Sequence, residues 1–379
     1  MLAITFFVPA MPVELKIFIA CIAIQVLYYA VVFFRLNFVR PFSSMPEMVP
    51  PVSVVICARN EAPALLRNLK IVLIQQFKQF EVVVVNDQST DNTAEVLVDY
   101  YKRNSNLKVV NIPAGINKPL AGKKYALMQG IEAATYDTIV VTDADCRPAT
   151  TLWLAKLVGA YMHGSQIVLG FSPFEKHPGF LNKLIRYENF ITALQYFGFA
   201  KLGIPYMGVG RNLSYKKELF KGFKGFEKKP KLLTGDDDLF VNTVATGRNT
   251  EVCIDKDTFV YTRPELTWGA WLNQKRRHLR SSFSYKFIHQ LLLFIFAASN
   301  FAVYVLLTWL CVKVIALKWV LGLFFGLILV KLLITFRVYK KLGAADLRFL
   351  SPALDVCYSV YLLLIFLLLL LKPKDSWKT

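Results

Sequence analysis

Ile139–Arg147 reads IVVTDADCR, an apolar β-branched run that ends in two aspartates spaced two residues apart. The first four residues are typical of a buried strand. Side chains two apart in extended backbone point to the same side, so Asp143 and Asp145 can converge on one point. Carboxylates that close repel each other unless a cation or a proton lies between them. The pattern predicts either a site for Mg²⁺ or Mn²⁺, which prefer oxygen ligands, or a solvated acidic turn before a helix.

Strand-like runs alternate with amphipathic helical segments upstream of this stretch. The expected strands are Val52–Cys57, Phe80–Asp87, Lys108–Ile112 and Thr138–Thr142, with helices from about Ala64, Asn92 and Gly122. This alternation predicts a parallel sheet with helices on both faces, whose ligands bind at the carboxyl ends of the strands. Glu61, Asp87 and Asp143 follow such ends and are expected at one rim. No G-x-G-x-x-G follows the first strand and no G-K-[ST] loop occurs, which disfavours dinucleotide and P-loop sites.

The composition is that of a membrane protein, with 55% apolar residues and a mean hydropathy of +0.42. The apolar residues concentrate in blocks at Ile17–Phe34, Phe287–Val312, Val314–Phe336 and Ala353–Leu371. Each block is long enough to cross a hydrocarbon core of about 30 Å. The first lacks a basic start and a small-residue cleavage site, so we expect a retained anchor rather than a signal peptide.

The formal net charge is +19, from 45 Lys and Arg against 26 Asp and Glu. Such an excess suits nucleic acid, an anionic membrane surface or phosphate-bearing substrates. No nucleic-acid partner is expected, because no aromatic-basic motif accompanies the charge. The positive-inside rule places Arg35, Arg40 and the Arg337–Arg348 loop in the cytoplasm, as for a bacterial inner-membrane protein. The lysines between the later blocks and after Leu371 would then lie outside, against that rule.

Cysteine usage agrees with a reducing compartment. The six cysteines form no C-x-x-C pair, and three of them lie in the apolar blocks. The pattern argues against a disulfide framework and against a zinc site.

Several segments between Pro51 and Arg280 resemble the motifs of family 2 glycosyltransferases, which have the GT-A fold. They are VSVVICARNEA (Val52–Ala62), VVVNDQSTDNT (Val83–Thr93), AGKKYALMQGI (Ala121–Ile131), TDADC (Thr142–Cys146), TGDDDL (Thr234–Leu239) and QKRRH (Gln274–His278). In the same order, they resemble six features of the family: the Arg-Asn-Glu strand exit and the motifs V-D-D-x-S-x-D-x-T, G-K-x-x-A-L-N-x-G, D-x-D, T-E-D-x-D-L and Q-x-x-R-W. Asn86 stands where the family has its first Asp. Motifs in this order are far more specific than any one of them.

The resemblance implies an α/β GT-A catalytic domain, Rossmann-like with a mostly parallel sheet, between N- and C-terminal transmembrane helices. The expected divisions are an anchor over 1–40, a cytoplasmic catalytic domain over 41–265, an amphipathic interface helix over 266–286 and about three transmembrane helices over 287–379. It also implies inverting transfer of a sugar from a nucleotide sugar, with Mn²⁺ or Mg²⁺ on the diphosphate.

The resemblance assigns donor-binding roles to side chains at the strand ends. Asp145 would bind the metal, and Asp143 would hold the ribose or share the metal. Asp87 would accept the base N–H of uracil, which favours uridine, and Glu61 would help to fix the nucleotide. Lys123 would lie near the diphosphate. Two alternatives stay open. Asp87 is then a helix cap or a turn residue. Lys123 is then a solvated lysine, and Lys124 takes its role near the diphosphate.

The general base is expected in TGDDDL. Residue-for-residue matching gives Asp236 this role, but Gly235 replaces the usual Glu, so Asp237 stays an alternative. Adjacent carboxylates raise one another's pKa, which suits a base near neutrality. A solvated acidic loop is the other interpretation.

QKRRH departs from the family at its last position, where His278 replaces Trp. Gln274 and Arg277 lie three apart on one helical face, and the guanidinium suits a diphosphate. His278 is expected to stack or bond there, or to be a surface histidine. Trp268 and Trp271 are expected to anchor the helix at the membrane interface.

The acceptor is expected to be a lipid. One anchor before the catalytic domain and about three spans after it resemble ceramide glucosyltransferase-type enzymes, which implies transfer of a single sugar to a lipid hydroxyl at the cytoplasmic leaflet. Four spans with few interior polar residues are thin for a polymer channel. Lys331 and Asp355 are the charges within or at the edge of the later spans, and Lys331 is long enough to snorkel to the interface. A processive polysaccharide synthase and a nucleotide-sugar sensor are the alternatives, and the oligomeric state stays open.

Overall fold

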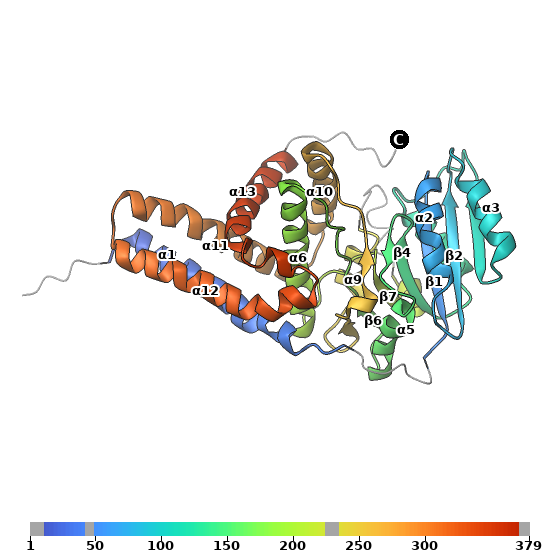
Figure 1. Cartoon of the computed structure of the whole chain (residues 1–379), viewed down its shortest axis with the longest axis horizontal. Helices are drawn as coiled ribbons and strands as arrows, with labels where there is room; N and C mark the ends of the chain where they lie inside the picture. Colours follow the sequence, from blue (N-terminus) through green and yellow to red (C-terminus); the bar gives the residue numbers. More distant parts are fainter. Residues whose placement is uncertain (1–10, 42–48, 224–234, 371–379) are drawn as a thin grey trace, which may run out of the picture.

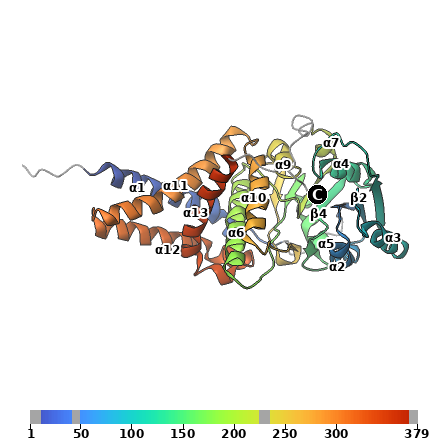
Figure 2. The same cartoon turned by 90° about the horizontal axis from the view of Figure 1, so that it is seen from above.

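An α/β half and a helical half lie at opposite ends of the molecule in the computed structural model, which describes residues 11–41, 49–223 and 235–370 (Figure 1). The long apolar helices extend to one side, and the sheet lies on the other. Figure 2 shows the same division from above, with α6 (Phe180–Lys201) and α10 (Trp268–Ser282) between the two parts. The junction therefore consists of helices.

The apolar runs form one mixed sheet in the order β3-β2-β1-β4-β7-β6-β8. The strands are β1 (Val52–Ala58), β2 (Phe80–Asp87), β3 (Leu107–Ile112), β4 (Thr138–Asp143), β6 (Ile167–Leu169), β7 (Leu213–Lys216) and β8 (Thr250–Val252). Strands β3, β2, β1 and β4 pair in parallel, with Val54 opposite both Val82 and Val140. Strand β7 runs antiparallel to β4 and β6. The mostly parallel sheet that the sequence predicts is confirmed.

Alternate residues of the central strand face two hydrophobic layers, because side chains in a strand point to opposite faces. Val54 packs with α2 (Ala62–Leu73), α3 (Thr93–Arg103) and α5 (Trp153–Val158). Val55 packs with α4 (Lys124–Ala133) and α6 on the other face. Both faces are thus covered, which leaves the carboxyl ends of β1, β2 and β4 as the open rim. A small second sheet pairs β5 (Arg147–Pro148) with β9 (Val260–Tyr261).

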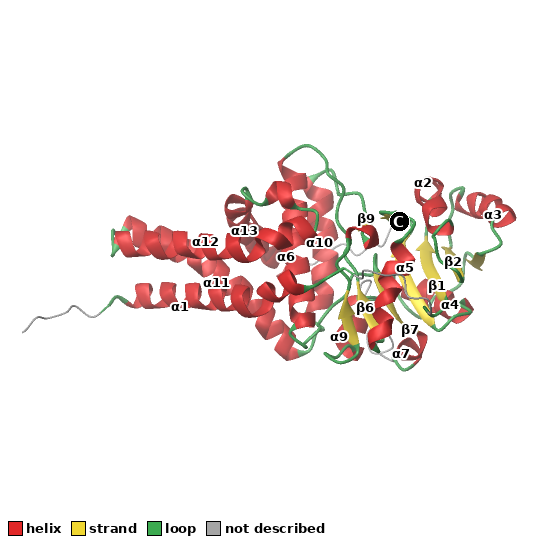
Figure 3. Ribbon diagram, turned by 60° about the horizontal axis from the view of Figure 1, so that its bottom comes forward, coloured by secondary structure: helices red, strands yellow, loops and turns green. Residues whose placement is uncertain are grey.

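Within the described residues, four helices are long and apolar enough to cross a membrane. They are α1 (Val13–Leu27, continued by tighter and wider turns to Phe38), α11 (Phe287–Val312), α12 (Leu317–Lys341) and α13 (Ser351–Leu370). Helices α1, α11 and α12 lie side by side as an arm, whereas α13 turns away from α12 and packs on α6 and α10 (Figure 3). The lysine-bearing tail after Leu371 lies outside the described residues.

Two expectations for side chains in the helical half are wrong. Trp271 is fully buried and stacks on Tyr361 of α13, with ring centroids 4.3 Å apart, so it packs helices together instead of anchoring an interface. Trp268 is 47% exposed. Lys331 does not snorkel, because its ammonium forms an ion pair with Asp355. In apolar surroundings the nearby Asp355 carboxylate stabilises the ammonium, so the side chain pairs with it and does not extend to the interface.

Candidate active site

A lysine joins two of the sequence motifs at the rim of the sheet. Lys123 Nζ lies 2.8 Å from Asp143 Oδ1 and 2.9 Å from Asp236 Oδ2. Burial alone would lower the pKa of Lys123, but the carboxylates of Asp143, Asp236 and Asp237 raise it well above its usual value. Burial likewise opposes ionisation of Asp143, but the Lys123 charge and hydrogen bond keep its pKa low. The ammonium therefore pairs with two carboxylates from different motifs at one place.

The D-x-D segment gathers ligand atoms suited to a hard cation. Asp143 ends β4, and its carboxylate, that of the exposed Asp145 and the Cys146 thiol place their ligand atoms within 4.8 Å of one another. Burial holds the pKa of Cys146 well above its usual range, so the thiol stays protonated and is a poor ligand. The carboxylate oxygens are thus the donors on offer, and this donor set fits Mn²⁺ or Mg²⁺.

The loops after β1 and β2 contact each other at the rim, and they carry the residues expected to bind the nucleotide. Asn60 has a left-handed φ of 55°, and its side-chain oxygen accepts from the backbone N–H of Thr90 at 2.8 Å. The Glu61 backbone N–H donates to Thr93 Oγ1 at 3.0 Å, directly before α2 begins. The Arg-Asn-Glu exit and the Gln-Ser-Thr-Asp segment thus form one unit, although they lie on different strands.

Asp87, the last residue of β2, is fully buried. Its Oδ1 forms an ion pair with Lys118, a residue that the sequence analysis missed. Its Oδ2 has no hydrogen-bond partner among the described residues. A buried carboxylate oxygen without a donor is costly, so a ligand donor there would be favourable. Lys118 lies in the loop after β3, where neither periodicity nor a motif marks it.

The acidic motif continues into α9 (Asp238–Val244), and Asp237 is its N-terminal cap. The Asp237 carboxylate accepts from the backbone N–H of Asp238 at 2.8 Å and from that of Gly210. A Cβ on Gly210 would lie 3.0 Å from Asp237 Oδ2, so the glycine permits this approach. Burial, then the charges of Asp236 and Asp238, raises the pKa of Asp237 to about 7.

Gly235 explains the departure from the family pattern at the Glu position. Its φ is +92°, and a Cβ would lie 2.5 Å from Leu239 Cδ1. A side chain there would be strained and would clash. Thr234, the first residue of the motif, lies outside the described residues.

Asp238 connects the acidic motif to the helix that follows. Its Oδ2 accepts from Ser281 Oγ, on α10, and from the Tyr285 hydroxyl at 2.7 Å. Nearby, Asn242 Oδ1 accepts from the Lys286 backbone N–H at 2.9 Å. Helix α9 is therefore fastened to the segment that joins α10 to α11, a connection the sequence analysis did not anticipate.

The QKRRH residues lie on α10, but their donor-binding role stays a prediction. Gln274 Nε2 donates to Glu265 Oε1 at 3.4 Å, Arg277 is half-buried and His278 is exposed. Arg211, which was not singled out, lies with its guanidinium 4.8 Å from the Phe174 ring centroid, and its charge also favours ionised Asp143.

Comparison with known proteins identifies the α/β half. Residues 53–223 match the family model "Glycosyl transferase family 2". Over 99 residues, 26% of this chain, the sequence is 33% identical to a poly-beta-1,6-N-acetyl-D-glucosamine synthase of Staphylococcus epidermidis. Over 94 residues, 25% of the chain, it is 33% identical to the Staphylococcus aureus synthase. These matches span 23% and 21% of the two relatives, less than a quarter of their length.

A solved structure shares the fold over most of the chain. The mannosyltransferase PcManGT from Pyrobaculum calidifontis, in complex with GDP-Man and Mn²⁺, superposes with a TM-score of 0.60 and 19% identity. The superposition covers 88% of this chain and 97% of that one. Together with the family match and the sheet order, this likeness establishes the GT-A fold. The chain therefore contains a glycosyltransferase family 2 domain, followed and preceded by helices that are apolar enough to span a membrane.

Proposed function

We propose that this protein transfers a single sugar from a nucleotide sugar, with inversion, to the hydroxyl of a membrane lipid. The observation that carries the proposal is the contact of Lys123 with both Asp143 and Asp236. It puts the D-x-D edge and the acidic motif on one rim, as a single displacement requires. The Asp238 contacts to Ser281 and Tyr285 hold that rim next to the end of α10 and the start of α11.

In this mechanism Asp236 is the general base. The acceptor oxygen forms a bond to the anomeric carbon, its proton passes to the Asp236 carboxylate, and the sugar–phosphate bond breaks with its electron pair on the leaving diphosphate. Asp237 is the weaker candidate, because backbone N–H groups of Asp238 and Gly210 already occupy its carboxylate. Asp237 instead holds the start of α9 in place.

The donor is proposed to lie along the rim from Asp87 to Asp145. Asp87 would accept a base N–H through its unpartnered oxygen, with Glu61 beside it, and Lys123, Gln274, Arg277 and His278 would face the diphosphate. Asp145 and Asp143 would hold Mn²⁺ or Mg²⁺, which supplies charge neutralisation for the leaving diphosphate. Since PcManGT binds GDP-Man and this chain's likeness to uridine-binding members rests on Asp87, both nucleotides belong in the test.

A second candidate is a processive polysaccharide synthase at the same site. It is favoured by the two staphylococcal relatives, which are named as polymer synthases. The single transfer is favoured instead by the small number of candidate spans, because the four apolar helices of the described residues are few for a polymer channel. The catalytic domain is proposed to face the cytoplasm, with the arm in the bilayer and no nucleic-acid partner.

The test is release of UDP or GDP by detergent-purified protein across a panel of nucleotide sugars, with Mn²⁺ or Mg²⁺ and a total lipid extract. We expect release that needs both metal and lipid and gives one discrete glycolipid. Asp236→Asn should lower the rate by about 10²- to 10⁴-fold, the usual contribution of a general base. The matched control is Asp99→Asn, which changes an exposed carboxylate on α3.

Other results would redirect the proposal. A long polymer as the product would replace it with the processive synthase. Nucleotide-sugar binding without release, equal in the wild type and Asp236→Asn, would indicate a sensor and not an enzyme.

A further inference from the structure

Helix α13 is long and apolar enough to cross a membrane, but it does not run alongside the other three candidate spans. The arm helices α1, α11 and α12 extend along the long axis of the molecule (Figure 1). Helix α13 instead runs across the end of the arm nearest the α/β half, beside α6 and α10 (Figures 1 and 2). Its direction therefore needs an explanation that hydropathy does not supply.

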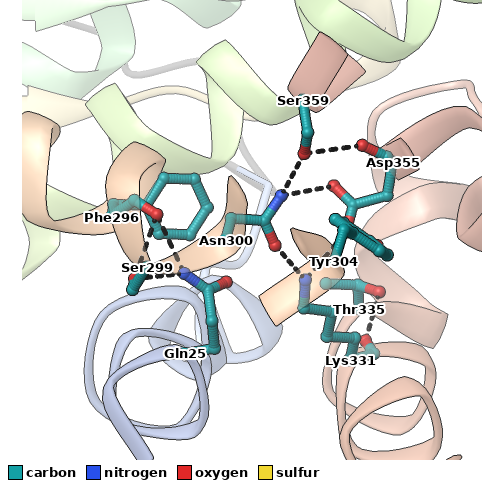
Figure 4. Close-up of polar contacts among 9 residues, drawn as sticks. All are labelled: Gln25, Phe296, Ser299, Asn300, Tyr304, Lys331, Thr335, Asp355 and Ser359. Carbon is teal, nitrogen blue, oxygen red and sulfur yellow. Dashed lines mark hydrogen bonds and ion pairs between the residues drawn. The ribbon is translucent and has the colours of Figure 1, made fainter. Parts of the chain in front are cut away.

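Polar contacts fasten the first turns of α13 to the arm (Figure 4). Asp355 Oδ2 lies 2.8 Å from Lys331 Nζ of α12 and accepts from the Tyr304 hydroxyl of α11 at 2.8 Å. Asn300 Nδ2 of α11 donates to Ser359 Oγ at 2.9 Å. Lys331 lies ten residues before the end of α12, about 15 Å along the helix axis. Helix α13 thus meets the arm in the half that is nearer to the sheet.

One face of α13 stays on the protein along the whole helix. Its buried residues recur every three or four positions and share one hydrophobic core with α6 and Trp271 of α10: Leu354, Tyr358, Tyr361 and Ile365. Leu368 and Leu369, near the end of the helix, pack against the same core. A helix that crossed to the opposite leaflet would leave this core on the way, and α13 does not leave it.

The helices packed against α13 do not suit the centre of a bilayer. Helix α10 carries four basic residues and no acidic one: Lys275, Arg276, Arg277 and Arg280. Tyr361, at the midpoint of α13, stacks on Trp271 in the first turn of α10. One turn later Lys275 forms an ion pair with Glu188 of α6 at 2.5 Å. A crossing α13 would draw these charges toward the hydrocarbon core, where arginine and lysine are costly.

The opposite face of α13 is an apolar stripe that nothing covers within the described part of the chain. Its residues are 41–59% exposed and follow one side of the helix: Val356, Val360, Leu363, Leu364 and Leu367. Because α13 joins the arm at Lys331, lipid around the arm also reaches this stripe. The stripe is therefore suited to acyl chains, while the other face is held by protein.

We propose that α13 lies in the plane of the membrane, at the interface on the side of the α/β half, with its exposed stripe against acyl chains. Helices α1, α11 and α12 then cross, and the chain after α13 stays on the side of the catalytic domain. Lys372, Lys374 and Lys378 follow α13 in the sequence, and the positive-inside rule places them with the basic catalytic domain. The inference rests on the proposed insertion of the arm in the bilayer and not on the sugar transfer.

The first test is the side of the membrane on which each end of the chain lies. The full-length protein carries one epitope tag before Met1 and a different one after Thr379, and protease is added to sealed inside-out vesicles. Three crossings put the two tags on opposite sides, so we expect one to be cleaved and the other to be protected. Cleavage or protection of both would overturn the inference. Extraction of the protein by alkaline carbonate would show in addition that the arm is not in the bilayer.

The second test compares depth along two helices. A fluorescent amino acid takes the place of Val360 or Leu367 on α13, and of Leu329 or Phe336 on α12 as the matched control. All four residues are exposed, and the members of each pair are seven apart. Quenching by lipids brominated at different acyl positions gives each depth. On a crossing helix, positions seven apart differ in depth by about 10 Å.

We expect the α12 pair to show this difference and the α13 pair to lie together at one shallow depth. A depth change along α13 equal to that along α12 would overturn the inference. Absence of quenching at both α13 positions would also overturn it, because a second copy and not lipid would then cover the stripe. If a substituted chain does not fold, the tags decide. Tags and depths as expected without lipid glycosylation would overturn only the proposed function.

Discussion

Two lysine–aspartate clusters in this molecule use the same chemistry in opposite settings. At the catalytic rim, Lys123 lies between Asp143 and Asp236, whose side chains are 33% and 11% exposed. Where the arm meets α13, Lys331 of α12 pairs with Asp355 of α13, which is 7% exposed, and the Tyr304 hydroxyl and the Asn300 amide also donate to its carboxylate. The first cluster carries more carboxylates than cations, and the second is balanced.

This difference in net charge and exposure predicts that the rim cluster can bind a further cation and that the Lys331–Asp355 pair cannot. Excess negative charge open to solvent can exchange its ammonium for a metal ion or a substrate group. A balanced pair in apolar surroundings has no such freedom, because removing either partner leaves a buried charge. The comparison therefore predicts different responses to the same type of substitution.

Lys331→Met should have the largest effect on stability. It removes the only cation that the structure places on the buried Asp355 carboxylate among the described residues, and breaking a buried ion pair costs about 3–5 kcal/mol of unfolding free energy. Unfolding in detergent, followed by fluorescence against denaturant, measures the loss, and Mn²⁺ should not restore it. Addition of Asp355→Leu to the same chain should recover most of the stability. A single variant as stable as the wild type would show that the arm cluster is open to water like the rim.

Lys123→Met should have a smaller effect, and the effect should depend on metal. The freed carboxylates of Asp143 and Asp236 are partly solvated, so the loss should lie between the values of exposed and buried pairs, about 1–3 kcal/mol. Millimolar Mn²⁺ should reverse it, because the cation takes the place of the ammonium. The same denaturant series with Mn²⁺ and with EDTA measures this, with Lys102→Met on exposed α3 as a control. No difference between the two series would argue against a metal at this rim.

Asp237→Asn should change how stability depends on pH. The Asp237 pKa is about 7 in the folded protein against 3.8 for an unperturbed carboxyl. Below pH 3.8 the group is protonated in both states; as pH rises toward 7 the unfolded chain ionises first, so the folded state loses stability, and the loss is constant above 7. Measured with EDTA, Asp237→Asn should therefore gain stability over the wild type more at pH 8 than at pH 5. Equal gains would show that Asp237 ionises normally.

The sequence predicted the rim well because strand ends and motif order are local features. Asp87 and Asp143 each end a parallel strand, so topology alone brings them to one edge. Lys118 and Arg211 were missed because no periodicity marks a loop lysine or an arginine beside a glycine. The fastening of Asp238 to Ser281 and Tyr285 joins segments more than 40 residues apart, and only the tertiary structure shows it.

The arm was predicted less well, for a physical reason. Hydropathy finds apolar helices but does not say which faces meet, so Lys331 and Asp355, 24 residues apart, gave no sign of pairing. Trp271 was assigned to an interface for the same reason, because an amphipathic helix does not reveal whether its aromatic face meets lipid or α13.

The smallest expected effects concern two tyrosines that donate to aspartates, one near the rim cluster and one in the Lys331–Asp355 cluster. The Tyr285 hydroxyl lies 2.7 Å from Asp238 Oδ2, and the Tyr304 hydroxyl lies 2.8 Å from Asp355 Oδ2. Replacement of either by Phe removes one hydrogen bond to a carboxylate and should cost about 1.5–3 kcal/mol of stability. Only Tyr285→Phe should also lower the rate of nucleotide release, because Asp238 fixes the helix that begins beside Asp236, and the unchanged KM for the nucleotide sugar would mark it as a positioning effect. If Tyr304→Phe slowed release equally, the two clusters would be coupled through α11, and the arm would belong to the catalytic unit.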